Sequence, residues 1–194
     1  MQFTPRFFLS IFTFSVITSI AFCNKTDLAV SYGCSQNDFL HELIADDNGN
    51  IYTIGGFYDT LYYDTSFLST ENYLDMYTMK RNSMGDILWI RNFGGPVWDM
   101  AIDICFSPGQ EFLYVTGFFE HFVDFDDIHL DAYGTIDIFL LKMNIEGDVI
   151  WAKNAGGSFY DYGYGIGTDQ SGNVYLTGKF ESPEITFDNQ TIYS

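Results

Sequence analysis

Short apolar runs separated by turn residues make up most of the chain after residue 23. Two of these runs, at 86–91 and 148–153, are rich in β-branched and aromatic residues, and a Gly-Gly pair follows each within a few positions. An earlier apolar run, at 76–80 and 138–143, leads into each of them through the turn sequence Asn-x-x-Gly-Asp. This order is typical of β-hairpins, and we expect the turn glycine to adopt the left-handed conformation.

A second hairpin is predicted in each unit. An Asp-rich turn with Gly-Asn at 46–52 leads to Gly55-Gly56-Phe57, and a matching stretch at 169–175 leads to Gly178-Lys179-Phe180. The first strand of this hairpin follows a recurring aspartate, which is Asp38, Asp99 or Asp161. No segment after residue 23 keeps a helical period with helix caps over a helix-length stretch, so the sequence predicts an all-β fold.

The arrangement recurs at a fixed step along the chain. Trp89 and Trp151 define this step, and the glycine pairs that end in Gly95 and Gly157 stand at the same separation. Other positions recur three times: Tyr52, Tyr114 and Tyr175; Gly55, Gly117 and Gly178; Asp64, Asp126 and Asp188. Self-similarity at a fixed period is typical of stacked units, none of which buries its own hydrophobic face, so these residues are predicted to be structural repeat positions.

Two hairpins per repeat give four strands, which is the content of a β-propeller blade. The predicted strands are 39–45, 50–57, 75–82 and 86–93 in the first blade, 99–105, 112–119, 137–144 and 148–154 in the second, and 161–168 and 173–180 in a partial third. The predicted organisation is a signal peptide at 1–23, a lead-in at 24–37, repeats at 38–95 and 96–157, and a partial repeat at 158–194.

About two and a half blades do not close a ring, because a closed propeller uses about four to eight blades. We therefore expect a fragment of a longer protein, in preference to association between copies. An open array is also expected to expose Tyr52, Phe57, Tyr175 and Phe180 on its outer faces and to leave a strand edge unpaired near 173–180.

The order of motifs within one repeat is distinctive. An aspartate is followed by Asp-x-x-Gly-Asn-x-Tyr-x-x-Gly-x-Phe, then Asp-x-Phe-x-x-Lys, then Asn-x-x-Gly-Asp-x-x-Trp and Gly-Gly, most clearly at 161–180 and 137–157. This order resembles the SBBP family of secreted β-propeller repeats over about 38–189, with local departures at 75–77 and 109–112. The resemblance implies a secreted bacterial protein whose repeats act as a scaffold or interaction module, and it implies no shared catalytic site.

The N-terminus predicts export. Arg6 precedes an uncharged, mostly apolar run from Phe7 that ends in Ala21-Phe22-Cys23, as in a secretory signal peptide cleaved after Cys23. A membrane anchor and lipoprotein processing at Cys23 are the alternatives. We favour the simple signal, because the run is short for a membrane span and Phe22 is bulky beside a lipidated cysteine.

The charge of the chain excludes some partners. After removal of 1–23 the chain has 7 Lys and Arg against 26 Asp and Glu, so its formal charge is 7 − 26 = −19. Nucleic acid binding draws on a clustered basic face, which this sequence lacks, and an acidic surface is repelled by anionic lipid. We expect no nucleic acid partner, no stable membrane span after signal removal, and a secreted or cell-surface location.

Two cysteines remain after signal removal, Cys34 and Cys105. A single disulfide between them is open. The alternative, a free and buried Cys105 within a strand, is the one that we favour.

Several residues are candidates for ligand or metal binding, and each also has a structural explanation. Trp89 and Trp151 are expected to pack between blades rather than to stack on a ligand, because they recur at the same place in each copy. The acidic stretches 46–50 and 124–127 are calcium candidates, but no complete Asp-x-Asn-x-Asp-Gly loop with a distal Glu is present, so turn formation is favoured.

The remaining polar residues form no recognisable catalytic set. His41, His121 and His129 lack zinc-ligand spacing, and neither a nucleophile elbow nor a phosphate loop occurs. Asp103 and Glu42 are the acidic inner-strand candidates for an active site that breaks the repeat symmetry. We expect no metal and no cofactor.

A non-catalytic extracellular scaffold or interaction module is the function that the sequence favours, with an unidentified protein or cell-surface glycan as partner. The alternatives are a propeller-type glycosidase or lyase and a carbohydrate-binding propeller.

Overall fold

The computed structural model describes residues 18–23, 26–31, 38–63 and 66–193, and the side chains of 38–63, 66–70 and 73–193 within them. These residues form antiparallel β-sheets without an α-helix, which confirms the predicted all-β class. Most of the predicted signal segment 1–23 lies outside the described residues, and its last part is strand β1 (Thr18–Cys23), which pairs with β2 (Thr26–Ser31). No helix in the described part is long and apolar enough to cross a membrane.

The first repeat forms a four-stranded sheet with the strand order β3-β4-β5-β6. Its strands are β3 (Phe39–Ala45), β4 (Ile51–Tyr63), β5 (Ser66–Arg81) and β6 (Ile87–Phe93). Each strand pairs antiparallel with the next one along the chain. The sequence predicted all four strands, but β4 and β5 are longer than expected where they meet.

The second repeat has the same order of strands. They are β7 (Asp99–Phe106), β8 (Phe112–Phe125), β9 (Ile128–Asn144) and β10 (Val149–Gly156), with a short 3-10 turn, η1 (Pro108–Gln110), between β7 and β8. The turn occupies the place where the sequence of this copy departs from Gly-Asn. There the Ser107 hydroxyl accepts a hydrogen bond from the Phe112 N–H at 3.0 Å.

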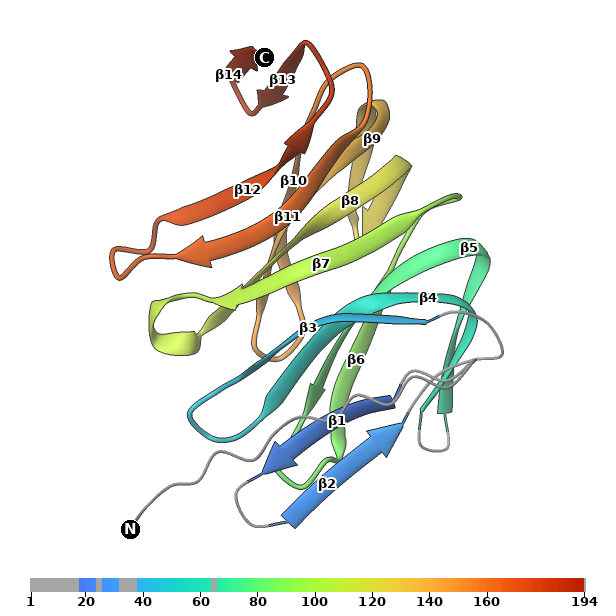
Figure 1. The fold of residues 1–194 in the computed structure, drawn as a ribbon, viewed down its shortest axis with the longest axis vertical. Helices are drawn as coiled ribbons and strands as arrows, with labels where there is room; N and C mark the ends of the chain where they lie inside the picture. The colour runs from blue at the N-terminus through green and yellow to red at the C-terminus, as the bar shows by residue number, and fades with distance from the viewer. Residues whose placement is uncertain (1–17, 24–25, 32–37, 64–65, 194) are drawn as a thin grey trace.

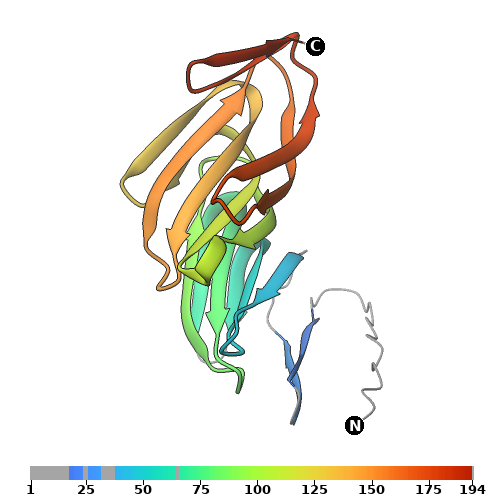
Figure 2. The same ribbon diagram turned by 90° about the vertical axis from the view of Figure 1, so that its left-hand side faces the viewer.

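The third repeat begins with the two-stranded sheet β11 (Asp161–Thr168) and β12 (Val174–Phe180). Strand β12 lies at the edge of this sheet, as expected. The last strands, β13 (Glu184–Phe187) and β14 (Gln190–Tyr193), form a hairpin that joins the sheet of the second repeat through β10. The sheets follow one another along the long axis of the molecule, and β7 lies between β3 and β11 (Figures 1 and 2).

A hairpin arm beyond the four strands of each repeat is the main feature that the sequence analysis missed. The arms are 60–63 with 66–69, 122–125 with 128–131, and β13 with β14, each one repeat step after the last. The second arm reaches back to the first repeat through a bridge between Gly94 and Asp124, and the third pairs Gly156 with Thr186. The two contacts are equivalent in the repeat, so each of these arms clasps the end of the preceding sheet.

The largest core cluster joins the first two repeats. Tyr52, Ile54, Met76 and Phe93 from the first repeat share it with residues of the second, among them Phe125 of the arm and Phe139 of β9. The Phe125 ring lies 5.2 Å from both Phe93 and Phe139 between centroids. The hydrophobic faces are therefore buried between repeats, as fixed-period stacking requires.

The expected exposure of Tyr52 and Phe57 was wrong. Tyr52 is buried because it faces the next repeat, where its ring meets Phe106 edge-on at 5.3 Å. Phe57 is buried in a second cluster with Leu61, Tyr77 and Met79. Tyr175, the third member of the tyrosine position, is 58% exposed, and Phe180 is partly exposed.

Replacing Phe125 by Ala tests whether the second arm stabilises the contact between the first two repeats. Phe125 is fully buried, so Phe125→Ala is expected to lower the free energy of unfolding by about 3–5 kcal/mol. The matched control is Phe67→Ala on the first arm, where the side chain is 61% exposed and the change should stay within about 0.5 kcal/mol. Urea unfolding followed by near-ultraviolet circular dichroism measures both, and equal effects would contradict the clasp.

Candidate interaction site at the junction between repeats

The Asn-x-x-Gly-Asp motif folds into a turn that its own side chains hold. Asn144 Oδ1 accepts hydrogen bonds from the backbone N–H groups of Glu146 and Asp148, at 3.1 and 2.8 Å. Asn144 Nδ2 donates to the Asp148 carboxylate at 2.9 Å, and Gly147 has a φ of 93°. The turn at Asn82 repeats this pattern, with a φ of 96° at Gly85. The glycine is required because an L residue is strained at this φ.

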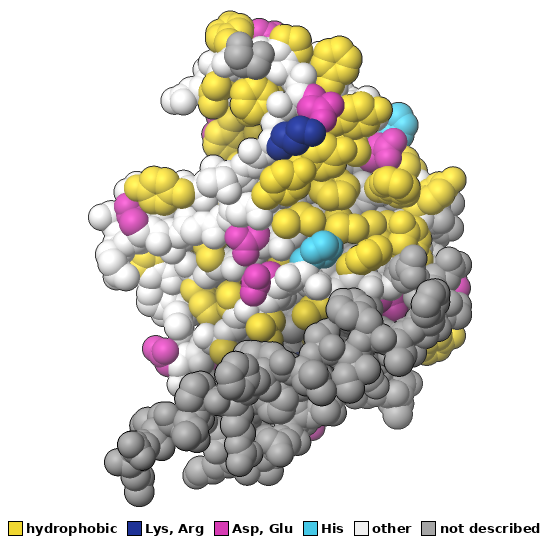
Figure 3. Space-filling model, in the orientation of Figure 1, with side chains coloured by type: hydrophobic (Ala, Val, Ile, Leu, Met, Phe, Trp, Pro, Cys, Tyr) yellow, Lys and Arg dark blue, Asp and Glu magenta, His cyan; other side chains and the backbone are white. Residues whose placement is uncertain are grey.

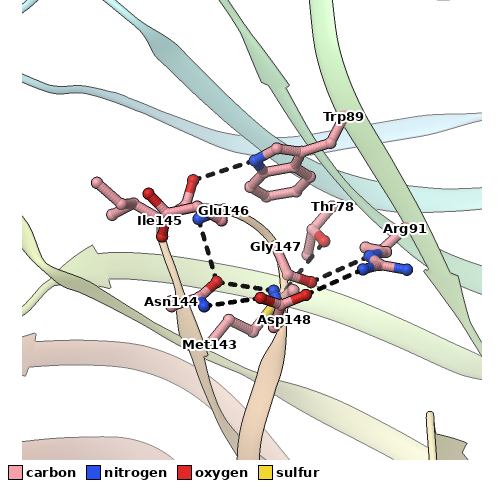
Figure 4. A network of polar contacts seen from close by, with 9 residues as sticks. All are labelled: Thr78, Trp89, Arg91, Met143, Asn144, Ile145, Glu146, Gly147 and Asp148. Atoms are coloured by element: carbon pink, nitrogen blue, oxygen red, sulfur yellow. Dashed lines mark hydrogen bonds and ion pairs between the residues drawn. The ribbon is translucent and has the colours of Figure 1, made fainter.

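The first repeat binds the turn of the second with three side chains, Lys80, Trp89 and Arg91, which we call the socket. Figure 4 shows Trp89 and Arg91 beside the turn. Lys80 Nζ and Trp89 Nε1 both donate to the Ile145 carbonyl oxygen at 3.0 Å. Arg91 Nε donates to the Gly147 carbonyl oxygen at 3.0 Å, and its Nη2 lies 3.4 Å from Asp148 Oδ1.

Packing makes the socket selective for glycine. A Cβ atom at Gly147 would lie 2.9 Å from the ring of Trp89, so the indole covers the turn at the point where the side chain is absent. The Tyr52 ring meets the indole edge-on, with 6.1 Å between ring centroids. Trp89 therefore donates a hydrogen bond and also forms one wall of the junction.

The Asp-x-x-Gly-Asn-x-Tyr motif has a turn-forming role. Asp46 accepts hydrogen bonds from Asn48 N–H, Asn50 N–H and Asn50 Nδ2, and its second oxygen lies 3.4 Å from the Tyr52 hydroxyl. Asp169 makes the same contacts with Ser171, Asn173 and Tyr175. Hydrogen bonds from Asn173 lower the pKa of the Asp169 carboxyl, because they stabilise its charged form. The oxygens of these turns are thus already occupied by donors of the same turn.

The Gly-Gly pairs lie where an arm crosses the end of a sheet. A Cβ atom at Gly95 would lie 1.9 Å from the Phe122 carbonyl oxygen, and one at Gly157 would lie 2.1 Å from the Glu184 carbonyl oxygen. The N–H groups of these glycines donate to Asp99 Oδ2 at 2.6 Å and Asp161 Oδ2 at 2.8 Å. Glycine and aspartate therefore recur together because the arm leaves no room for a side chain.

Two buried carboxyls of these junctions have raised pKa values. Burial, together with a smaller effect of the nearby Asp75 and Asp161 carboxylates, raises the pKa of Asp99 to about 8 and the pKa of Asp137 to about 6. Among the described side chains, Asp99 Oδ1 and Asp137 Oδ1 are buried without a hydrogen-bond partner. A carboxyl that keeps its proton avoids the cost of an unpaired buried charge.

Close approach of the backbone also explains the glycine position that recurs at Gly55, Gly117 and Gly178. A Cβ atom would lie 1.8 Å from the Phe39 carbonyl oxygen at Gly55, 1.9 Å from that of Met100 at Gly117, and 2.2 Å from that of Tyr162 at Gly178. Each lies next to an irregularity in the pairing of the first two strands. These glycines shape the bulge and do not line a site.

The structure brings the predicted tyrosine and tryptophan repeat positions together in pairs, one pair in each of the first two repeats. Tyr52 lies against Trp89, and Tyr114 lies against Trp151 with the same centroid distance of 6.1 Å. Tyr175 has no tryptophan against it among the described residues. The sequence analysis missed the basic members, Arg91 and Lys153, although both occupy the same repeat position in a chain with 8 Lys and Arg in total.

The acidic candidates for catalysis are engaged with backbone N–H groups. Asp103 Oδ2 accepts from the Ile166 N–H of the third repeat at 2.7 Å, and its Oδ1 accepts from the Ile104 N–H at 2.8 Å. Glu42 accepts from the Leu43 N–H at 3.0 Å. Asp103 thus links the inner strands β7 and β11.

The histidines lie apart from one another in the fold. His41 Nε2 on β3 lies 2.9 Å from Met100 Sδ, and burial lowers the pKa of this imidazole. His129 lies on the second arm beside Asp124 and Asp131, which raise its pKa, and His121 has a φ of 67° in β8. Within the described ranges, no three His, Cys, Asp or Glu side chains are grouped so as to hold a metal ion.

Cys105 in β7 has a free thiol, and Cys34 lies outside the described residues. Burial raises the pKa of the Cys105 thiol to about 12, so the thiolate needed for nucleophilic chemistry is scarce at neutral pH.

Hydrophobic side chains gather across the middle of the face seen in Figure 3, where β7 and β11 lie in Figure 1. On β11 the rings of Tyr162 and Tyr164 stack with 6.1 Å between centroids and an interplanar angle of 11°. Phe118 meets Tyr162 edge-on at 5.1 Å, and Tyr164 is 52% exposed. This exposed aromatic face is distinct from the socket.

Stability is expected to fall as the pH rises. The raised pKa values of Asp99 and Asp137 mean that the folded state holds protons that the unfolded state releases near pH 4. Their contribution is complete below about pH 4 and is lost as the pH rises through about 6 and 8. The loss is up to about 1.4 kcal/mol per pH unit for each group.

Urea titrations between pH 5 and pH 9 measure this slope. Asp99→Asn mimics the protonated carboxyl and should flatten the slope, and Asp47→Asn, on an exposed turn, is the control. A slope that Asp99→Asn leaves unchanged would rule out this carboxyl as its source.

The two tryptophans offer a second comparison. Trp89→Ala removes a hydrogen bond and a wall of the occupied junction, and it should cost about 3 kcal/mol, at the low end for a large aromatic. Trp151→Ala, whose indole N–H has no hydrogen-bond partner among the described residues, should cost less than about half as much. Thermal and urea unfolding of both variants test this, and a cost below about 1 kcal/mol for Trp89→Ala would contradict the packing role.

Comparison with known proteins agrees with this geometry. Residues 150–179 match the family model of the SBBP beta-propeller repeat, a stretch that runs from β10 to β12 across one junction. A segment of 60 residues, 31% of the chain, is 33% identical to an uncharacterised WD repeat-containing protein of Acanthamoeba polyphaga mimivirus, and it covers 4% of that protein. The predicted resemblance is thereby confirmed: this chain carries β-propeller repeat sequence of the SBBP type.

Proposed function

We propose that this protein is a non-catalytic, secreted or cell-surface β-propeller repeat module that acts as a scaffold or interaction domain. One observation carries the proposal: the polar residues that recur in the repeat contact other parts of the repeat array. Lys80, Trp89 and Arg91 bind the turn of the next repeat, and Asp99 and Asp161 bind the glycine pairs. Residues used in this way build the architecture of the repeat array.

The blade count belongs to the same proposal. The sheets β3–β6 and β7–β10 have the strand content of two blades, and β11 with β12 has that of half a third. We propose that they are part of a larger propeller encoded by a longer protein. The match to a WD repeat-containing protein, of which this chain covers a small share, supports a longer array.

The competing enzymatic function is testable through Asp103 and Glu42. A glycosidase or lyase needs a free carboxyl, whereas both of these accept backbone hydrogen bonds. We expect no turnover of chromogenic glycosides or acidic polysaccharides above a buffer blank, by the parent chain, Asp103→Asn or Glu42→Gln. Turnover that Asp103→Asn abolishes would establish the enzyme.

Carbohydrate binding is the second candidate, and the exposed aromatic face favours it. Stacked, exposed tyrosines offer the flat apolar surface that a sugar ring packs against. Glycan-array binding that Tyr164→Ala removes and Tyr193→Ala retains would assign the partner to this face, since both side chains are exposed. Binding lost equally in both variants would argue against it.

A further inference from the structure

Two aromatic residues stay exposed at one repeat position. Trp98 and Tyr160 each precede the buried aspartate of a junction, Asp99 or Asp161, and they are 47% and 42% exposed. We call their side chains the junction rings. Large aromatic side chains are highly buried on average, so exposure that recurs at the same position indicates a contact surface.

The backbone that carries the junction rings is fixed by pairing. Trp98 forms a parallel bridge with Leu74, and its carbonyl oxygen accepts a hydrogen bond from the Glu120 N–H at 3.0 Å. Tyr160 forms the equivalent bridge with Ile136. This backbone is therefore ordered before a partner arrives, which lowers the entropic cost of binding.

A neighbouring repeat does not cover this position. Trp98 leads into β7, which lies between β3 and β11, so its repeat has a described repeat on each side (Figure 1). The ring is exposed all the same. Hydrophobic side chains in Figure 3 extend to the right-hand side of the face, where β7 begins in Figure 1. The exposed surface therefore belongs to the interior of the array as well as to its third repeat.

A glutamate lies beside each junction ring on a neighbouring segment of the chain. Glu120 and Glu181 occupy one repeat position, and their N–H groups donate to the carbonyl oxygens of Trp98 and Tyr160 at 3.0 and 3.1 Å. A ring face near a carboxylate is an arrangement that binds a cation, because both the π system and the negative charge attract it.

A lysine of the chain already occupies one of the two glutamates. Lys179 Nζ lies 2.5 Å from Glu181 Oε1. In the second repeat the position of Lys179 is taken by Phe118, and Glu120 makes no ion pair with any described side chain. The place that Lys179 fills in the third repeat is therefore open to an external cation in the second.

The other Lys and Arg side chains that the structure describes are engaged away from the junction rings. They contact turn carbonyls, aromatic rings or a carboxylate elsewhere in the repeats, and they are Lys80, Arg81, Arg91, Lys142 and Lys153. The full chain has a formal charge of −18. A basic partner is therefore attracted to the chain as a whole and meets no competing described cation at Glu120.

We propose that the junction rings and their glutamates form a docking surface for an extended basic segment of another polypeptide. The proposal rests on the proposed interaction function and names the partner's chemistry. Stacked sheets lie about 10 Å apart, and an extended chain rises about 3.3 Å per residue. A segment with arginine or lysine at every third residue would therefore place one cation at each junction.

The probe is a fluorescently labelled peptide with arginine at every third position and serine between. Fluorescence anisotropy with the full chain is expected to show saturable binding that weakens as the salt concentration rises. Trp98→Ala and Glu120→Gln should each weaken the binding at least about tenfold. Lys179→Met should strengthen it, because this change frees Glu181 for the peptide.

The matched controls are Tyr62→Ala and Asp47→Asn, which remove an exposed ring and an exposed carboxylate elsewhere in the first repeat. Both should leave the peptide affinity unchanged. Near-ultraviolet circular dichroism checks that each variant is folded, and a gain in affinity for Lys179→Met cannot arise from a loss of folding.

Binding that is absent, or equal for the parent chain, Trp98→Ala and Glu120→Gln, would overturn the proposal. Glycan-array binding that Trp98→Ala removes, without peptide binding, would assign the surface to a glycan and also overturn it. Failure here leaves the scaffold function standing, because a different partner can serve that function. Glycoside turnover would overturn the non-catalytic function without altering the peptide affinity.

Discussion

The structure depends on the stacking of one four-stranded sheet on the next. The cluster around Tyr52, Met76, Phe125 and Phe139 takes residues from both repeats, so neither repeat completes this core alone. The arms strengthen the dependence, because Phe125 leaves its own sheet to lie between Phe93 and Phe139. Burial between units is thus the constraint that the polar contacts must accommodate.

Polar contacts at the junctions set the register of the stack. The socket uses Lys80, Trp89 and Arg91 to hold carbonyl oxygens that the tight turn leaves free of strand pairing. Lys80 and Arg91 are two of the eight Lys and Arg residues of the chain. These two basic residues lie where the neighbouring repeat presents oxygen atoms, which helps an acidic chain to hold its units together.

The glycine pairs and buried carboxyls allow an arm to approach the end of a sheet closely at the same junctions. An arm crosses the end of the preceding sheet so closely that no side chain fits at Gly95 or Gly157, and the freed N–H groups need acceptors. Asp99 and Asp161 supply them, and burial raises the pKa of one carboxyl in each pair of neighbouring aspartates, which is Asp99 beside Asp75 and Asp137 beside Asp161. We expect these carboxyls to couple the stability of the stack to pH.

The sequence by itself determined the all-β class, the repeat step and the approximate positions of strands β3 to β12, because apolar runs and obligatory turn glycines are local signals. Gly85 and Gly147 have the expected left-handed conformation for that reason. The arms could not be found this way, because the ladders within 60–69 and within 122–131 carry no signal of their role. The second arm contacts another sheet through the bridge between Gly94 and Asp124, which is a tertiary contact. Only the tertiary structure decided that Tyr52 is buried while Tyr175 is exposed, and that the indole N–H of Trp89 binds a turn while that of Trp151 has no hydrogen-bond partner among the described residues. Equivalent residues in similar local sequence differ in this way because their environment is the neighbouring repeat.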